Sequence, residues 1–230
     1  MLAVATVFVV TSPAAQAQSL GSSTPDVEPP VVIDPGPAPT PPEERPTLAA
    51  FVGDSFTAPA QVGTPVDNWA EHVASSNCWA PTYLGKHGSG YVNPAGSAWQ
   101  YVNRVPQVTA SAPDLVVVQG STNDLYLIGV REAAVGTLAL IRAQNPYATV
   151  VVVGPVKAPR YDLVRLTALR DELAAAAAVT GALFVDPLDG DWLGDDDFAD
   201  GLHLTTEGNA RFGAKVVDRL DTVGVSTSCT

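Results

Sequence analysis

Cysteine, methionine and histidine are scarce in this sequence, which has two, one and three of them among 230 residues. Two thiols are too few for a disulfide-dense miniprotein or for a zinc site with four cysteine ligands. No apolar run reaches the ~18–20 residues that a membrane-spanning helix needs. These absences exclude a small disulfide scaffold and an ordinary membrane-spanning protein.

Positive charge is also scarce, because 12 Lys and Arg stand against 24 Asp and Glu, for a net charge of −12. Such a surface repels phosphate backbones and anionic lipids, so we expect no nucleic-acid partner. Hydrophobic residues make up 46% of the chain and charged residues 16%, which is enough to bury a core. The length suits one domain with extensions, since single domains commonly take roughly 100–200 residues.

The first 46 residues differ in composition from the rest. Residues 2–10 form a short apolar run, and Ala15-Gln16-Ala17 provides small residues suited to cleavage before Gln18. We predict a signal peptide over residues 1–17, although no Lys or Arg precedes the apolar run; a buried first strand is the alternative. The protein is then secreted or displayed at the cell surface.

Residues 18–46 are rich in proline, which removes backbone donors and prevents helices and inner strands. This segment is predicted to be a semi-extended linker, serving either as a stalk or as an exposed tail, and residues 47–230 form the folded domain. In an exported protein, Cys78 and Cys229 favour one disulfide that ties the C-terminal tail to the body. In a cytosolic protein they would be two unrelated small hydrophobic residues.

Short valine-rich runs alternate with helical patterns through the rest of the chain. The runs have the composition of strands buried on both faces of a parallel sheet; they are Leu48–Gly53, Asp114–Gln119, Thr149–Val153 and Ala182–Asp186, with Tyr83-Leu84 as a weaker candidate. Helical periodicity is found over Trp69–Ser76, Val130–Gln144, Tyr161–Val179 and Thr205–Leu220. This alternation predicts an α/β fold, a three-layer α/β/α sandwich with a mostly parallel sheet.

In such sheets, reactive groups lie just beyond the carboxyl ends of the strands. After the first run comes Gly53-Asp54-Ser55-Phe56, where a serine at a strand-to-helix turn presents its hydroxyl above the sheet. The alternative is an ordinary turn with a capping serine. After the run Asp114–Gln119 comes Gly120-Ser121-Thr122-Asn123-Asp124, in which Asn123 is either a turn residue or a donor to a developing oxyanion.

A glycine-rich loop over residues 85–93 follows the weaker strand candidate. Gly88 and Gly90 indicate tight turns or a close approach of the backbone to another group. An ordinary loop is the alternative.

A serine nucleophile needs a neighbouring base, which is usually histidine. His72 lies within a predicted helix and is expected on the surface, His87 lies in the glycine-rich loop, and His203 follows the last predicted strand. Asp200, three residues before His203, can curl back in a turn to accept from Nδ1, which directs Nε2 towards a serine. The acidic run 195–197 lacks the spacing of a calcium loop and is expected to be solvated, so we expect no metal and no cofactor.

These blocks, in this order over residues 48–220, resemble the SGNH, or GDSL-type, hydrolase family. The resemblance implies a flavodoxin-like sheet and acyl transfer through a serine, with Ser55 as nucleophile, His203 as base and Asp200 as the carboxylate that orients it. The oxyanion hole implied by the resemblance consists of the backbone N–H groups of Ser55 and Gly90 and the side chain of Asn123.

Two features depart from the family pattern. Gly88 competes with Gly90 for the oxyanion role, and Gly90 is preferred because it follows a small residue. In the third block Ser121 stands two residues before Asn123, where the family has glycine.

The sequence therefore predicts a secreted, monomeric serine esterase for carboxylic esters, either O-acyl groups of glycans or small lipid-like esters. One alternative is an acyltransferase on the same machinery, with a sugar alcohol in place of water. Another is a non-catalytic binding domain that retained the fold. Loss of Ser55, Asn123 or His203 would favour the last alternative, and all three are present.

Overall fold

A computed structural model describes residues 45–58, 67–227 and 229. The signal peptide predicted for residues 1–17 and nearly all of the predicted linker over 18–46 lie outside the described residues. No helix in the described ranges is long and apolar enough to cross a membrane.

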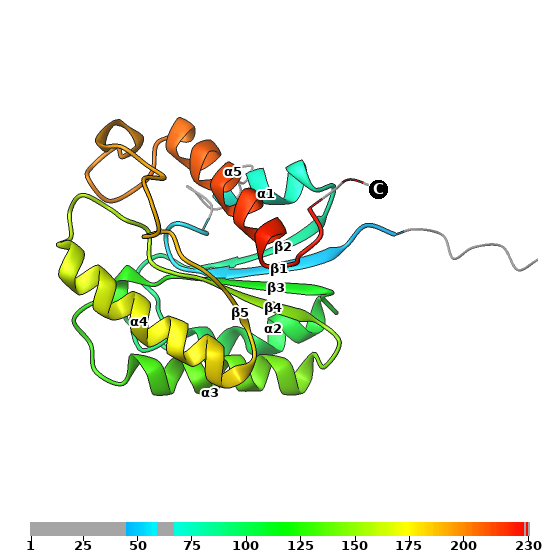
Figure 1. The fold of residues 1–230 in the computed structure, drawn as a ribbon. Helices are drawn as coiled ribbons and strands as arrows, with labels where there is room; N and C mark the ends of the chain where they lie inside the picture. Colours follow the sequence, from blue (N-terminus) through cyan, green and yellow to red (C-terminus); the bar gives the residue numbers. More distant parts are fainter. Residues whose placement is uncertain (1–44, 59–66, 228, 230) are drawn as a thin grey trace, which may run out of the picture. The chain divides into compact units, whose positions relative to one another are not determined.

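The described part of the chain contains a five-stranded sheet in which every pairing is parallel. Its strand order is β2-β1-β3-β4-β5 (Figure 1). The strands are β1 (Leu48–Gly53), β2 (Ala80–Gly85), β3 (Leu115–Gln119), β4 (Thr149–Val153) and β5 (Leu183–Val185). This is the flavodoxin-like order, in which successive strands are added first on one side of β1 and then on the other, with the switch point between β1 and β3.

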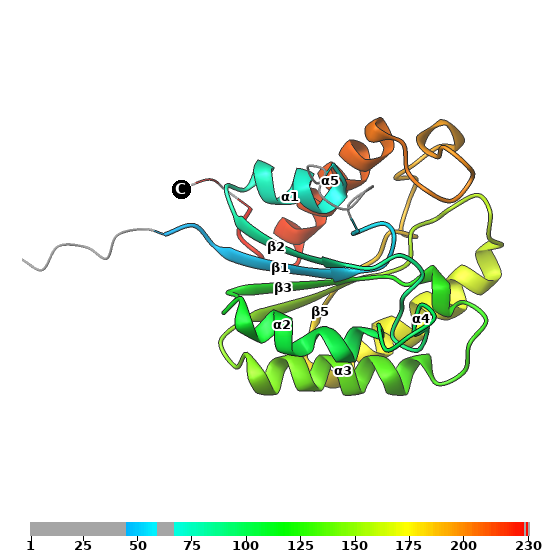
Figure 2. The same cartoon turned by 180° about the vertical axis from the view of Figure 1, so that it is seen from behind.

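Helices cover both faces of the sheet. In Figures 1 and 2, α1 (Trp69–Ser76) and α5 (Thr206–Thr222) lie on one face, and α2 (Val105–Ala110), α3 (Val130–Gln144) and α4 (Leu163–Thr180) lie on the other. Alternate residues of the strands enter separate cores, so that Phe51 packs beneath α1 and α5 while Val52 faces the opposite layer. The predicted three-layer α/β/α sandwich is confirmed.

The helix boundaries follow local signals in the sequence. Thr205 caps α5 by accepting from the Gly208 amide at 3.0 Å, and the apolar stripe of α5 is completely buried at Phe212, Val216 and Leu220. In α4, Leu166, Leu169 and Leu173 are buried at spacings of three and four residues, whereas Leu163 at the first position of the helix is 52% exposed.

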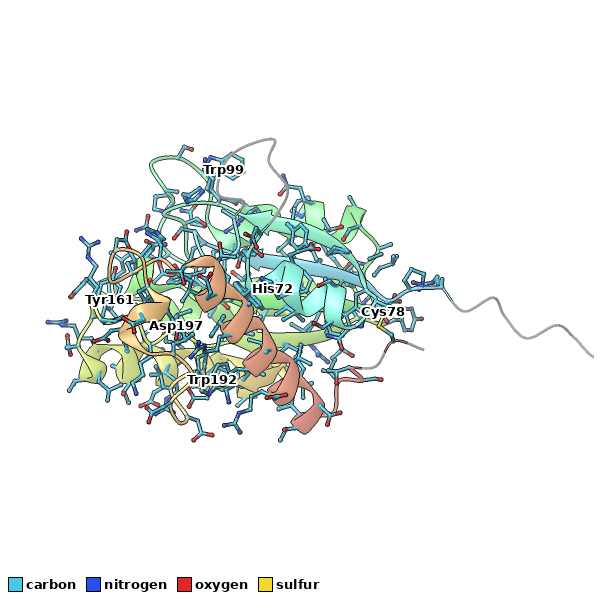
Figure 3. The ribbon with its side chains drawn as sticks, turned by 90° about the horizontal axis from the view of Figure 1, so that it is seen from above. His72, Cys78, Trp99, Tyr161, Trp192 and Asp197 are labelled. Atoms are coloured by element: carbon cyan, nitrogen blue, oxygen red, sulfur yellow. A yellow bond between two sulfur atoms is a disulfide. The ribbon has the colours of Figure 1, made fainter. Side chains whose placement is uncertain are left out.

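The two cysteines form a disulfide in the structure, with their Cα atoms 5.1 Å apart. Figure 3 shows the yellow sulfur atoms at Cys78, just after α1, against the C-terminal tail. The tail therefore returns to the body beside the edge strand β2, which begins two residues after Cys78.

Candidate active site

Ser55 lies in the turn that follows β1, at the carboxyl edge of the sheet. The turn is closed from within, since the carbonyl of Asp54 accepts from the amides of Thr57 and Ala58 at 3.2 and 2.9 Å, and its carboxyl group accepts from the Phe56 amide at 2.9 Å. Asp54 is completely buried, while Ser55 beside it is partly exposed. The turn thus presents a serine hydroxyl above the sheet.

His203 reaches this hydroxyl from the loop between β5 and α5. Its Nε2 atom lies 3.2 Å from Ser55 Oγ, and its Nδ1 atom lies 2.9 Å from Asp200 Oδ2. The ring also packs against Phe56, with 6.2 Å between ring centroids. The structure therefore brings Ser55, His203 and Asp200, the three residues predicted from the sequence, into one hydrogen-bonded line.

A tight turn brings the side chain of Asp200 against the backbone and the ring of His203. Asp200 Oδ1 accepts from the amides of Leu202 and His203 at 3.0 and 2.7 Å, and Gly201 between them has a φ of +74°, which favours glycine. The hydrogen bond from the His203 backbone is the main cause that holds the pKa of Asp200 well below its ordinary value, and the bond to the His203 ring adds to it. Asp200 consequently remains a carboxylate, able to stabilise a protonated imidazole.

The loop after β3 is joined to the loop after β2. The side-chain amide of Asn123 donates to the Ser89 carbonyl at 3.0 Å, and Asn93 Nδ2 donates to the Asn123 carbonyl at 3.2 Å. One of the two hydrogens on Asn123 Nδ2 is used in this way, which leaves the other for a ligand.

The amide of Gly90, predicted as an oxyanion donor, is occupied: it donates to the Asn93 carbonyl at 3.0 Å. Close packing requires glycine at position 90, because a Cβ atom there would overlap the Asp124 carboxylate. This geometry argues against Gly90 as the oxyanion donor. No described residue accepts from the amide of Gly88, which has a φ of +74°.

Beneath these loops lies a layer of buried polar residues that the sequence did not single out. Arg104 donates to the Gly53 carbonyl at 2.8 Å and to Ser89 Oγ at 2.9 Å, and also to the Leu84 carbonyl. Its guanidinium thus joins the ends of β1 and β2. A buried arginine with backbone partners has no short-range sequence signal, because its partners are up to 51 residues away.

Asp124 closes the glycine-rich loop from the other side. Its carboxylate accepts from the amides of Tyr91, Val92 and Asn93 at 2.6, 3.3 and 2.8 Å. Burial raises the pKa of Asp124, and these three hydrogen bonds oppose that rise.

A cavity of about 230 Å³ opens beside the serine. Ser55, His203 and Leu204 line one part of it, and His87 of the glycine-rich loop lines another. Asn209 also faces the cavity, but its side chain is engaged with the Trp69 amide at 3.1 Å and with the Thr205 carbonyl at 2.9 Å. With a volume of about 230 Å³ the cavity is small, and both polar and apolar groups line it.

Two expectations at nearby positions are corrected. The acidic run is not simply a solvated loop: residues 195–197 form a short 3₁₀ helix in which Asp197 is buried, accepting from the Gly194 amide at 2.8 Å. His72, which Figure 3 labels, is partly buried rather than fully exposed, with 34% of its side chain accessible. It is covered because α5 approaches α1 closely at Gly213.

Residues 51–211 match the model of the GDSL-like lipase/acylhydrolase family. The chain belongs to this family. None of the curated proteins matches the sequence significantly.

The structure is similar to solved structures that share little sequence with it. A lipase/acylhydrolase from Enterococcus faecalis has 21% identity and a TM-score of 0.60, over 76% of this chain and 96% of that one. A carbohydrate acetylesterase from Sinorhizobium meliloti has 20% identity and a TM-score of 0.59, over 77% and 99%. A family 2 carbohydrate esterase with a carbohydrate-binding domain, from Corynascus thermopiles, has 18% identity and a TM-score of 0.58, over 81% and 68%. At these identities the likeness shows a shared fold.

Proposed function

We propose that this GDSL-family protein is a secreted serine esterase that hydrolyses carboxylic esters through an acyl-enzyme. The observation that carries the proposal is the line from Ser55 through His203 to Asp200, with contacts of 3.2 and 2.9 Å. A serine is a weak nucleophile until an adjacent base takes its proton, and His203 Nε2 lies within reach of that proton.

In the proposed reaction, Ser55 Oγ attacks the ester carbonyl while His203 takes the hydroxyl proton. His203 then returns this proton to the leaving alcohol, and a water molecule deprotonated by the same ring releases the acid and restores the serine. Asp200 stabilises the protonated ring throughout. All bonds broken and formed are accounted for by serine, ester and water, so the chemistry requires no metal or cofactor.

For the oxyanion hole we propose the Ser55 amide, the Asn123 side chain and the amide of Gly88 in place of that of Gly90. The Gly90 amide is already bonded to the Asn93 carbonyl. Gly88 follows directly after His87, which lines the cavity next to Ser55. Such donors act on the negative charge that develops on the carbonyl oxygen.

The small cavity favours short acyl groups, and two of the similar structures belong to esterases that act on carbohydrates. We therefore propose short O-acyl groups on glycans as the preferred substrates. The disulfide supports an extracellular location.

A panel of aryl esters from acetate to palmitate, run beside acetylated xylan and acetylated pectin, tests this function. The expected result is hydrolysis that is fastest with acetate and falls with chain length, together with acetate release from a glycan. Preference for palmitate would overturn the substrate class, and no hydrolysis of any ester would overturn the esterase assignment.

A further inference from the structure

The buried carboxyl group of Asp54 takes no part in the proposed proton transfers, although it precedes the nucleophile. Its Oδ1 atom accepts from the Phe56 amide at 2.9 Å. The side-chain amide of Gln119 is oriented so that its oxygen accepts from the Gly120 amide at 3.2 Å. In this orientation Gln119 Nε2 donates to the same Asp54 oxygen at 3.1 Å. The other oxygen, Oδ2, lies 2.7 Å from Ser121 Oγ.

Ser121 Oγ has more partners than a single hydroxyl hydrogen can serve. It accepts from the Asn123 amide at 3.0 Å and lies 2.9 Å from the Ser89 carbonyl, in addition to its contact with Asp54. A hydroxyl carries one hydrogen, and a carbonyl oxygen can only accept. If Ser121 donates to Ser89, the 2.7 Å contact is a hydrogen bond only when Asp54 carries the proton.

The charges around Asp54 also favour its protonated, neutral form. Arg104, Asp124 and Tyr101 are the ionisable groups that act on it. Arg104 supplies one positive charge, and Asp124 balances it as a carboxylate that accepts from three backbone amides. A charged Asp54 would add an unbalanced negative charge to a buried layer, which is strongly unfavourable.

The pKa of Asp54 is raised, which is the direction that favours the neutral acid. Burial is the main cause that raises this pKa to about 6, and the hydrogen bond with Ser121 is the first of the causes that oppose the rise. When the Ser121 hydrogen points to Ser89 instead, that opposing interaction is lost and the pKa of Asp54 rises further.

We propose that Asp54 is a positioning residue that acts as a neutral carboxylic acid and donates from Oδ2 to Ser121. Ser121 in turn holds the Ser89 carbonyl and the Asn123 amide, so that the loops after β2 and β3 meet at the oxyanion site. A neutral acid also avoids the repulsion that a carboxylate beside Ser55 would exert on the developing oxyanion. The inference rests on the proposed function for its catalytic consequence, but the protonation state of Asp54 does not depend on it.

Carbon-13 NMR of protein labelled at the aspartate carboxyl carbons tests this state directly. The Asp54 resonance is identified by its loss in Asp54→Asn, and Asp114, whose pKa is held low by Arg45, supplies a carboxylate reference in the same spectrum. At pH 7 we expect Asp54 to have the chemical shift of a neutral acid. A carboxylate shift at pH 7 would overturn the proposal, whatever the outcome of the esterase assays.

Activity of two variants tests the positioning role. Asparagine can still accept from Phe56 and Gln119 and donate to Ser121, so Asp54→Asn should retain kcat within about threefold. Asp54→Ala removes the donor and should lower kcat at least tenfold, with KM nearly unchanged in the folded fraction. An equal loss of kcat in both variants would contradict a neutral donor. If Asp54→Ala does not fold, the NMR measurement still tests the protonation state, and the kcat of Asp54→Asn still tests whether a neutral donor is sufficient.

Discussion

The side-chain amide of Asn123 is joined to the carbonyl of Ser89 by a 3.0 Å hydrogen bond. This bond orients the amide and connects the two loops that carry the proposed oxyanion donors. The second hydrogen of the same amide is the one that we propose for the charge that develops on the substrate.

Asn123→Ala should lower kcat by about 10²–10³-fold while raising KM much less, because the lost donor acts mainly in the transition state. Asn123→Asp should be worse, since a carboxylate repels the oxyanion. Melting temperature and kcat are measured on the same preparation. A lowered melting temperature with unchanged kcat would restrict Asn123 to the structural bond with Ser89.

Asp200→Asn should lower kcat by about 10⁴-fold, as loss of the orienting carboxylate does in other triads. Because the pKa of Asp200 is held below its ordinary value, its charge persists when the pH is lowered to about 4. Loss of the Asp200 charge should therefore not limit the rate as the pH is lowered to about 4. Asp196→Asn, at an exposed position in the same loop, is the matched control and should keep full activity.

Asp54 should make stability fall as pH rises, because its pKa is raised in the folded state. The unfolded chain takes up a proton near pH 4 and the folded chain at a higher pH, so the stabilising contribution is full below pH 4 and is lost as the pH rises through the folded-state pKa of Asp54. The difference in unfolding free energy between the parent and Asp54→Asn should fall by roughly 2–3 kcal/mol between pH 4 and pH 6. Urea titrations at both pH values measure it. A constant difference would show that the pKa of Asp54 is not raised.

The disulfide between Cys78 and Cys229 closes a loop with a sequence separation of 151 residues. The chain-entropy model gives a stabilisation of up to about 5 kcal/mol for a loop of this length. Intact mass without reductant should be two hydrogens lower than after reduction, and Cys229→Ser should melt at a lower temperature than the parent. Two free thiols in protein purified without reductant would refute the pairing.

The central strands were predictable because burial on both faces leaves a continuous apolar run. The bounds of β1 and β4 agree with those expected from the sequence. The edge strand β2 was only partly visible, since it contains Pro81 and is half-exposed along most of its length. Helix α2 has six residues with Pro106 near its start, which is too short for a periodic pattern.

The proximity of the three residues proposed for catalysis was predictable for a different reason. Ser55, Asp200 and His203 fall in short blocks whose chemistry is local, and Asp200 folds back on His203 within one turn. The supporting residues are defined by distant partners: Ser121 contacts Asp54 across 67 positions. The choice between Gly88 and Gly90 depends on which amide is already bonded within the loop, and composition does not specify that.

The central claim is that Ser55 is the nucleophile. It is tested most directly by measuring ester turnover and labelling by a serine-directed phosphonate in the parent, in Ser55→Ala and in the control Ser75→Ala, which alters an exposed serine on α1. The proposed mechanism predicts one phosphonate on Ser55 in the parent and in Ser75→Ala. It predicts neither labelling nor turnover in a folded Ser55→Ala. Turnover at the parental rate in Ser55→Ala would contradict the mechanism.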